Sequence, residues 1–334
     1  MLILVPVFFR SWRYTNRNRE PYCSGRNDIP NNLSVVKETK IVAIKTIQHP
    51  SGRTFKLGRK RPVARCPRFA LKNYLTRSLP PPPATCDYTK HAKAALSEMY
   101  DNDKLGDCVI AGMAHVVGVL TGNSGTKPVI YNNKEIIGLY SAIGGYVPGE
   151  PSTDQGCDEQ TALNYWENNG ALPPGSASKT GAHKIAGWMT VDSSNVEECR
   201  TALWLFENLY FGLELPDAWI TPNPPSASGF TWDVAGAPDP NNGHCVVGVG
   251  YTAAGITIDT WGMTGLMTNA AVAKYPNQAA GGELYTVVSI DAIAKASQKA
   301  PSGFDWSQLI ADFDSMGGDV AGLLGQNKSA AAGS

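Results

Sequence analysis

The sequence predicts an α+β fold of two lobes, a helical lobe followed by an antiparallel β lobe, with a basic N-terminal extension. Apolar runs of helical character fall in the first half of the chain beyond residue 86, and short β-branched and aromatic runs split by glycines follow Gly212. With 334 residues and 43% hydrophobic residues, the chain is long enough to bury a sizeable core.

Four helices are expected in the first lobe. The run 109–120 is almost wholly apolar or small, so it predicts a buried helix that begins at Cys108. Shorter helices are predicted at 134–141, at 160–168 with Gly170 as the stop signal, and at 196–206 with a polar cap among residues 193–195.

Three strands are expected in the second lobe, at 244–251, 255–261 and 284–289. After residue 301 the sequence predicts one amphipathic helix over 304–316, followed by a flexible Gly/Ala/Ser tail. The two lobes are expected to pack around one cleft.

Charge is distributed unevenly. Residues 1–85 hold 17 lysines and arginines against three acidic residues, whereas residues 86–334 hold 12 against 26. A four-proline run, 80–83, marks a domain edge, which divides the chain into a basic, partly irregular arm (1–79), a globular domain (80–300) and a C-terminal helix and tail (301–334). The arm, including the 59–61 basic cluster, has three interpretations. It could bind nucleic acid, another polyanion or an assembly partner. It could instead fold back on its own acidic domain, or it could be a solvated extension.

The location is predicted to be non-secretory and reducing, either cytoplasmic or virion-associated. The nine apolar residues at the start are too few to span a bilayer and lack a signal-peptide layout. Seven cysteines, an odd number, occur without a Cys-x-x-Cys pair. No phosphate-binding glycine loop or zinc pattern is seen, so no cofactor is expected.

Cys108 is the first candidate for chemistry. Gly106 and Asp107 form a turn that leads into it, and the partial positive charge of a helix N-terminus favours a thiolate. A buried helix cysteine is the alternative, since free cysteine is often buried.

A cysteine nucleophile needs a histidine and a group to orient it. Of the five histidines, His244 opens a strand, and Asp259 lies on the next strand as its expected orienting carboxylate. His115 is seven residues along the predicted helix, about 10 Å from Cys108 by helix rise, too far for direct pairing, and is expected to be a core histidine. The alternatives for His244 and Asp259 are a strand-end histidine and a strand-edge acid.

These fragments resemble the papain-like cysteine peptidases over about residues 80–290, as a divergent bacterial or phage-type member. Asn102 stands six residues before Cys108, where that family has its oxyanion glutamine. The run from Gly243-His244 to Tyr251 is similar to the family's histidine strand, and Asp259-Thr-Trp261-Gly resembles its Asn-Ser-Trp-Gly motif. The stretch from Gly156-Cys157 to Gly170 resembles one wall of its substrate cleft.

The resemblance implies a role for each of these positions. Cys108 would be the nucleophile, His244 the acid/base and Asp259 its orienting group. The Asn102 amide and the Cys108 N–H would bind the oxyanion, and Trp261 would shield the histidine. Gly106, Gly243 and Cys157 would line the substrate cleft.

The chain also departs from the family pattern. Val109 replaces a tryptophan, and Leu105 replaces a cysteine that would pair with Cys157. Asp158-Glu159-Gln160 replaces the small residues of the cleft wall, and no recognisable inhibitory propeptide precedes the domain.

The function that follows is a thiol hydrolase, a peptidase or amidase acting on peptide or protein substrates through a Cys-His-Asp triad and an acyl-enzyme. Two alternatives stay open. One is a catalytically weak or inactive domain of the same fold that serves as a structural or binding component of a virion or other assembly. The other is a transferase or deamidating toxin with the same triad.

Overall fold

The computed structural model describes residues 44–62, 69–125, 127–176, 183–221, 223–290, 293, 303–315 and 320. The apolar run at the start, most of the predicted basic arm and the predicted C-terminal tail lie outside these residues.

A mostly antiparallel sheet of eight strands forms the centre of the described fold. Its strand order is β4-β10-β5-β7-β8-β9-β6, with β3 paired to β7 and only the β6–β9 pair parallel. The strands are β3 (Cys86–Asp87), β4 (Ile185–Thr190), β5 (Leu209–Glu214), β6 (Thr231–Trp232), β7 (Gly243–Tyr251), β8 (Gly255–Thr260), β9 (Met263–Thr268) and β10 (Glu283–Ser289).

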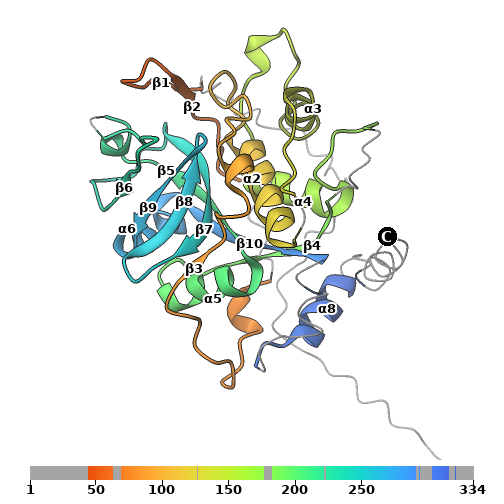
Figure 1. The fold of residues 1–334 in the computed structure, drawn as a ribbon. Helices are drawn as coiled ribbons and strands as arrows, with labels where there is room; N and C mark the ends of the chain where they lie inside the picture. The colour runs from red at the N-terminus through yellow and green to blue at the C-terminus, as the bar shows by residue number, and fades with distance from the viewer. Residues whose placement is uncertain are drawn as a thin grey trace, which may run out of the picture.

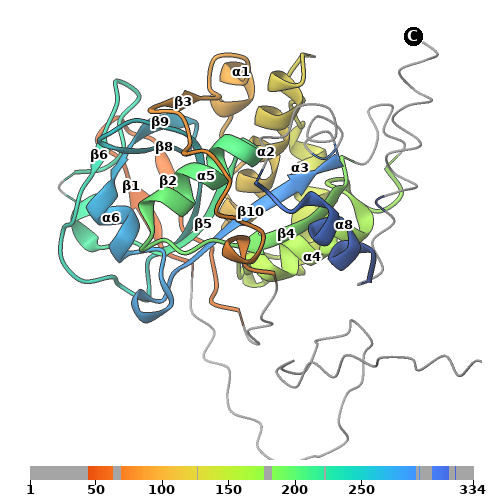
Figure 2. The same ribbon diagram turned by 90° about the horizontal axis from the view of Figure 1, so that it is seen from below.

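The helices lie on both sides of this sheet. They are α1 (Lys93–Leu96), α2 (Cys108–Asn123), α3 (Asn133–Gly144), α4 (Glu159–Asn169), α5 (Val196–Phe206), α6 (Asn269–Lys274) and α8 (Trp306–Ser315). Short 3-10 turns occur at Leu71–Asn73, Pro151–Thr153, Asp217–Trp219 and Gln278–Ala280. In Figure 1, α2, α3 and α4 gather beside the sheet as one lobe, and the view from below in Figure 2 brings α5 and α8 to the front.

The faces of β7 separate two cores. Cys245, Val247 and Val249 pack with the α2–α4 side, whereas Val246 packs with the core under α5 and α6. Successive side chains of a strand point to opposite faces, and both faces are covered here, so β7 is buried along its whole length. The predicted two-lobed α+β fold is confirmed.

The predicted helices and strands occur where the sequence places them, with ends shifted by a few residues. Asn195 caps α5 through the Glu198 N–H, and Gly170 follows the end of α4. The 304–316 prediction corresponds to α8. Strands β4 and β9 were not predicted from local sequence, because Gly187 and Gly265 interrupt otherwise short runs.

Residues 44–62 do not behave as a separate arm. They form the hairpin of β1 (Thr46–Gln48) and β2 (Thr54–Lys56), and Phe55 and Leu57 are buried in the domain core, as is Leu71 further along. The boundary predicted at Pro80 therefore does not separate the described part of 1–79 from the domain, since an apolar side chain in a basic segment still finds the nearest core.

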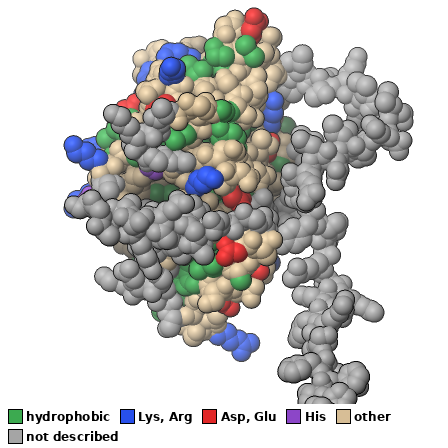
Figure 3. All heavy atoms as spheres, turned by 90° about the vertical axis from the view of Figure 1, so that its right-hand side faces the viewer, with side chains coloured by type: hydrophobic (Ala, Val, Ile, Leu, Met, Phe, Trp, Pro, Cys, Tyr) green, Lys and Arg blue, Asp and Glu red, His purple; other side chains and the backbone are tan. Residues whose placement is uncertain are grey.

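The cations of this segment pair with the acidic globule. Lys45, Lys56 and Arg61 each lie against a carboxylate, from Asp217, Asp154 and Glu214 respectively, and Arg59 meets two. For these residues, the structure favours the fold-back interpretation over a surface open to a polyanion. On the face in Figure 3, basic, acidic and apolar side chains are interspersed. Within the described ranges, no helix is long and apolar enough to cross a membrane.

Candidate active site

Cys108 is the first residue of α2 and is only 1% exposed. Its thiol lines a pocket together with Asn102, His115, His244, Asp259, Thr260 and Trp261. Burial raises the pKa of the Cys108 thiol to about 12, and contacts with the backbone of Gly58 and Cys245 offset only part of that rise. The sulfur at the helix N-terminus is therefore a neutral thiol in this state.

His244 lies near the start of β7, also 1% exposed. Its Nε2 is 2.7 Å from the Thr260 hydroxyl oxygen, while its Nδ1 is buried with no hydrogen-bond partner. The Trp261 ring stacks on the imidazole at 4.0 Å between centroids, and the Phe55 ring stacks on Trp261 at 4.8 Å. Burial lowers the pKa of His244 to about 3, so the imidazole is neutral in this state.

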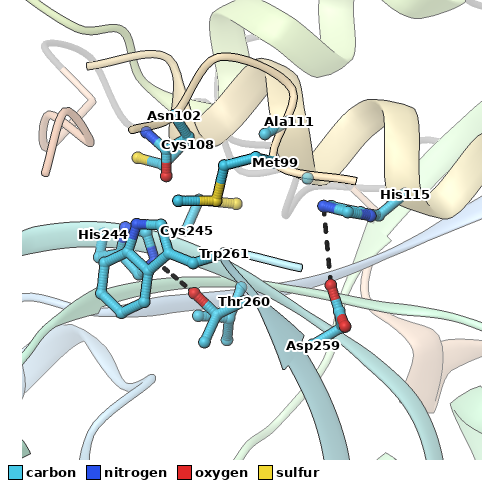
Figure 4. Close-up of a pocket in the computed structure, with 12 residues that line it drawn as sticks. Met99, Asn102, Cys108, Ala111, His115, His244, Cys245, Asp259, Thr260 and Trp261 are labelled. Atoms are coloured by element: carbon cyan, nitrogen blue, oxygen red, sulfur yellow. Dashed lines mark hydrogen bonds and ion pairs between the residues drawn. The ribbon is translucent and has the colours of Figure 1, made fainter. Parts of the chain in front are cut away.

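Asp259 does not contact His244 as predicted. Strand β8 places Asp259 opposite Val247, so it shares the face of Cys245, and Thr260 falls on the face of His244. The Asp259 carboxylate lies 3.6 Å from Nε2 of His115 instead, and the dashed lines in Figure 4 show the two pairs side by side. The predicted Asp259–His244 contact is corrected: Thr260 holds His244. Side chains alternate between the two faces of a strand, so the sequence 255–260 shows that Asp259 and Thr260 lie on opposite faces. Only the pairing of β7 with β8 shows which of the two shares the face of His244.

Asn102 lines the same pocket as Cys108, and Figure 4 shows the two side chains next to each other. Its side-chain amide donates to two backbone carbonyls, of Lys56 at 3.2 Å and of Leu105 at 3.0 Å. One of those carbonyls belongs to the N-terminal segment. A side-chain amide that donates to carbonyl oxygens has the chemistry that an oxyanion donor needs.

Residues 54–61, called the covering segment below, run across this site. The Gly58 carbonyl accepts from the Cys157 N–H at 3.1 Å, and the Lys60 N–H donates to the Cys157 carbonyl at 2.9 Å. The Arg59 N–H donates to the Gly243 carbonyl at 3.1 Å. The segment thus pairs as a short parallel bridge with one wall of the cleft and is held on the other side by the residue before His244.

Glycines let the covering segment lie this close. A Cβ on Gly58 would come within 1.7 Å of the Gly106 carbonyl oxygen, and one on Gly156 within 1.7 Å of the Gly58 oxygen. A Cβ on Gly243 would be 2.1 Å from the Arg59 oxygen. The covering segment therefore packs directly between backbone walls, and the space that it fills is called the groove below. Gly106, Gly243 and Cys157, predicted as cleft residues, each contact the covering segment.

The other predicted histidine and cysteine positions have structural surroundings. His115 is buried on α2 and packs edge-on against Tyr100 at 4.9 Å. Cys157, Cys199 and Cys245 are buried free thiols. Among the described residues, no group of three or more histidine, cysteine, aspartate or glutamate side chains is arranged to hold a metal ion.

No family model matches the sequence, and no curated protein matches it. Several solved structures resemble the fold at low identity. Xylellain, a cysteine protease from Xylella fastidiosa, is 15% identical with a TM-score of 0.47, over 70% of this chain and 98% of that one.

Two further solved structures of cysteine proteases show a similar degree of likeness. Procathepsin L2 proteinase from Tenebrio molitor larval midgut is 12% identical with a TM-score of 0.48, over 70% of this chain and 78% of that one. The Carica candamarcensis cysteine protease CMS1MS2, in complex with E-64, is 16% identical with a TM-score of 0.43, over 62% of this chain and 99% of that one.

Proposed function

We propose that the protein is a papain-like thiol hydrolase, a peptidase or amidase, with Cys108 as nucleophile and His244 as acid/base. The observation that carries this proposal is the pocket that Cys108, at the N-terminus of α2, shares with a histidine whose Nδ1 has no other partner. Thr260, in place of the predicted Asp259, is the orienting residue, because its hydroxyl lies on Nε2.

The reaction uses these groups in order. The Cys108 thiol gives its proton to Nδ1 of His244, and the sulfur attacks the substrate carbonyl carbon. The Asn102 amide and the Cys108 N–H stabilise the oxyanion. His244 then protonates the leaving amine, the C–N bond breaks, and a water attacks the acyl-enzyme with His244 as base. Trp261, stacked on the imidazole, excludes water from its face.

In this structure the site is closed. The Asn102 amide is bonded to the Lys56 carbonyl, and Gly58 lies against the thiol. Peptide can enter the groove only where the covering segment leaves it. We therefore propose that the described state is a resting form and that hydrolysis requires displacement of residues 54–61.

The test uses the full chain with Gly58→Ala, since the added methyl group has no room against Gly106. The variant must keep a cooperative melt, and Lys60→Ala, an exposed side chain on the same segment, is its control. Gly58→Ala is expected to hydrolyse a mixed peptide library at least tenfold faster than the wild type and than Lys60→Ala. Cys108→Ala in the same background should abolish the activity.

The outcome that contradicts the proposal is a folded Gly58→Ala chain whose Cys108 reacts with iodoacetamide no faster than in the wild type and that hydrolyses nothing. The buried, neutral thiol would then belong to a domain of the same fold that serves as a structural or binding component.

A further inference from the structure

The Arg59 side chain fills an acidic pocket inside the groove. It is 1% exposed, and its Nε donates to the Glu159 carboxylate at 3.1 Å. One terminal nitrogen donates to the Gly281 carbonyl at 2.8 Å, and the other donates to Glu283. Three acceptors thus converge on one guanidinium, one at the start of α4 and two at or just before the start of β10.

The pocket is built by the domain, not by the covering segment. Glu159 is the first residue of α4 and is fully buried, and one of its oxygens has no hydrogen-bond partner. Glu283, on β10, also accepts from the Tyr285 hydroxyl, which in turn accepts from the Gln160 amide at 2.8 Å. These bonds fix the Glu283 carboxylate in place without Arg59.

Gly212 on β5 leaves the space that the guanidinium occupies. A Cβ there would lie 2.9 Å from the Arg59 Nε and 2.7 Å from the Glu159 oxygen. Two carboxyl groups face one cation: burial and the neighbouring Glu283 raise the pKa of Glu159 well above its ordinary value, and the Arg59 guanidinium opposes that rise. A buried carboxylate pair of this kind is costly when empty, which favours a cation as its occupant.

The pocket lies one residue from the thiol along the bound backbone. Gly58 lies against Cys108, and the next residue, Arg59, is the one that bridges to Cys157. A substrate paired with the same wall presents the side chain opposite Cys157 to Glu159 and Glu283.

We propose that Glu159 and Glu283 form a substrate subsite for an arginine side chain, and that Arg59 occupies it in the closed form. The proposal rests on the proposed function. The substrates are peptides in which arginine directly precedes the residue whose carbonyl Cys108 attacks, and they run along the wall at Cys157 in the direction opposite to the covering segment, in which Arg59 follows Gly58. Arginine suits the pocket better than lysine, because its planar fork reaches several acceptors at fixed angles.

The experiment compares two peptidyl chloromethyl ketones on the full-length Gly58→Ala chain. Both carry glycine at the reactive end, and they differ only in the preceding residue, arginine or leucine. The Cys108 thiolate displaces chloride from the methylene carbon and forms a thioether, whose formation rate is followed by mass spectrometry. The arginine probe is expected to react at least tenfold faster.

The matched variants identify the carboxylates. Glu159→Gln together with Glu283→Gln, in the same background, should reduce the preference to less than twofold. Glu214→Gln, which removes the carboxylate paired with the half-exposed Arg61, should leave the preference intact. Where Gly58→Ala lacks a cooperative melt, Arg59→Lys is used with the same two probes.

Iodoacetamide separates the possible failures. If it labels Cys108 rapidly and the two peptidyl probes react equally, the arginine subsite is overturned while the thiol hydrolase stands. A preference for arginine that survives both glutamine substitutions also overturns the subsite. If iodoacetamide and both probes leave Cys108 of a folded variant as slow as in the wild type, the proposed function itself fails.

Discussion

His244 and His115 are two buried imidazoles that line the same pocket from different elements. His244, on β7, contacts a neutral hydroxyl, and His115, on α2, faces the Asp259 carboxylate. The pair that looks most like an acid/base couple is the one without a role in the proposed reaction. The face of the strand on which a residue lies, more than the type of a neighbouring side chain, therefore decides which histidine can act with the thiol.

Burial acts alike on both pairs. It lowers the pKa of His115 to about 4 and that of His244 to about 3, and it raises the pKa of the Asp259 carboxyl. Neither Asp259 oxygen has a hydrogen-bond partner. The His115–Asp259 pair is therefore best described as a neutral acid beside a neutral imidazole, held in the core between α2 and the sheet.

The largest expected difference between the two histidines is in catalysis. In the Gly58→Ala chain, His244→Ala should lower the rate of peptide hydrolysis by about a thousandfold, the range for loss of a general acid/base. His115→Gln should change it less than fivefold. Initial rates on one peptide, with melting curves for both variants, make the comparison. An equal loss of activity in His115→Gln would contradict the assignment of His244 as the acid/base.

A pH profile tests whether the thiol is neutral in the closed form. Thiolate is the deprotonated form, so below a pKa of about 12 its fraction rises tenfold with each pH unit. Alkylation of Cys108 in the wild-type chain should thus rise by about a thousandfold from pH 6 to pH 9, without a plateau. Gly58→Ala, which admits water, should show a flatter profile. A wild-type plateau near neutral pH would mean a preformed thiolate.

Exchanging the two orienting candidates gives a smaller effect. In the opened chain, Thr260→Val should slow hydrolysis about tenfold, the worth of one buried hydrogen bond, and Thr260→Ser should restore it. Asp259→Asn should change the rate less than twofold. The split between kcat and KM sharpens this result, since Thr260 acts on the imidazole and is expected to alter kcat alone. A larger loss of activity in Asp259→Asn than in Thr260→Val would support Asp259 as the orienting residue instead of Thr260.

The smallest effect concerns stability. The folded chain holds the Asp259 proton to a higher pH than the unfolded chain does, so this residue's contribution to stability is lost as pH rises. Relative to the wild type, Asp259→Asn should gain about 2–4 °C in melting temperature at pH 8 and almost nothing at pH 4. A gain that is larger at pH 4 would indicate an ionised Asp259.

Local patterns were sufficient to predict much of the fold. The apolar run after Cys108 predicts α2, and the β-branched runs predict β7 and β8, because these signals depend only on neighbours in the sequence. The Thr260 contact with His244 depends on the register of two strands, which no local pattern specifies. Without that register, the sequence predicts Asp259 as the orienting group of His244.

Glu159 and Arg59 are two unusual features of the sequence whose connection is seen only in the structure. Glu159 was a departure from the expected cleft wall, and Arg59 was part of a solvated or polyanion-binding cluster. A hundred residues separate them in sequence, and the structure pairs them inside the groove. A basic segment that contains Gly58 and an apolar Phe55 carries no local signal that it will cover a site.

The most direct test of the central claim maps which cysteine reacts first. Full-length wild-type and Gly58→Ala chains are treated with iodoacetamide at pH 6, and modification is followed at Cys108 and at Cys86, the less buried of the two. We predict that Cys86 reacts first in the wild type, that Cys108 overtakes it in Gly58→Ala, and that His244→Ala in the Gly58→Ala chain cancels the gain. Labelling that follows exposure alone, unchanged by His244→Ala, would contradict an activated thiol at this site.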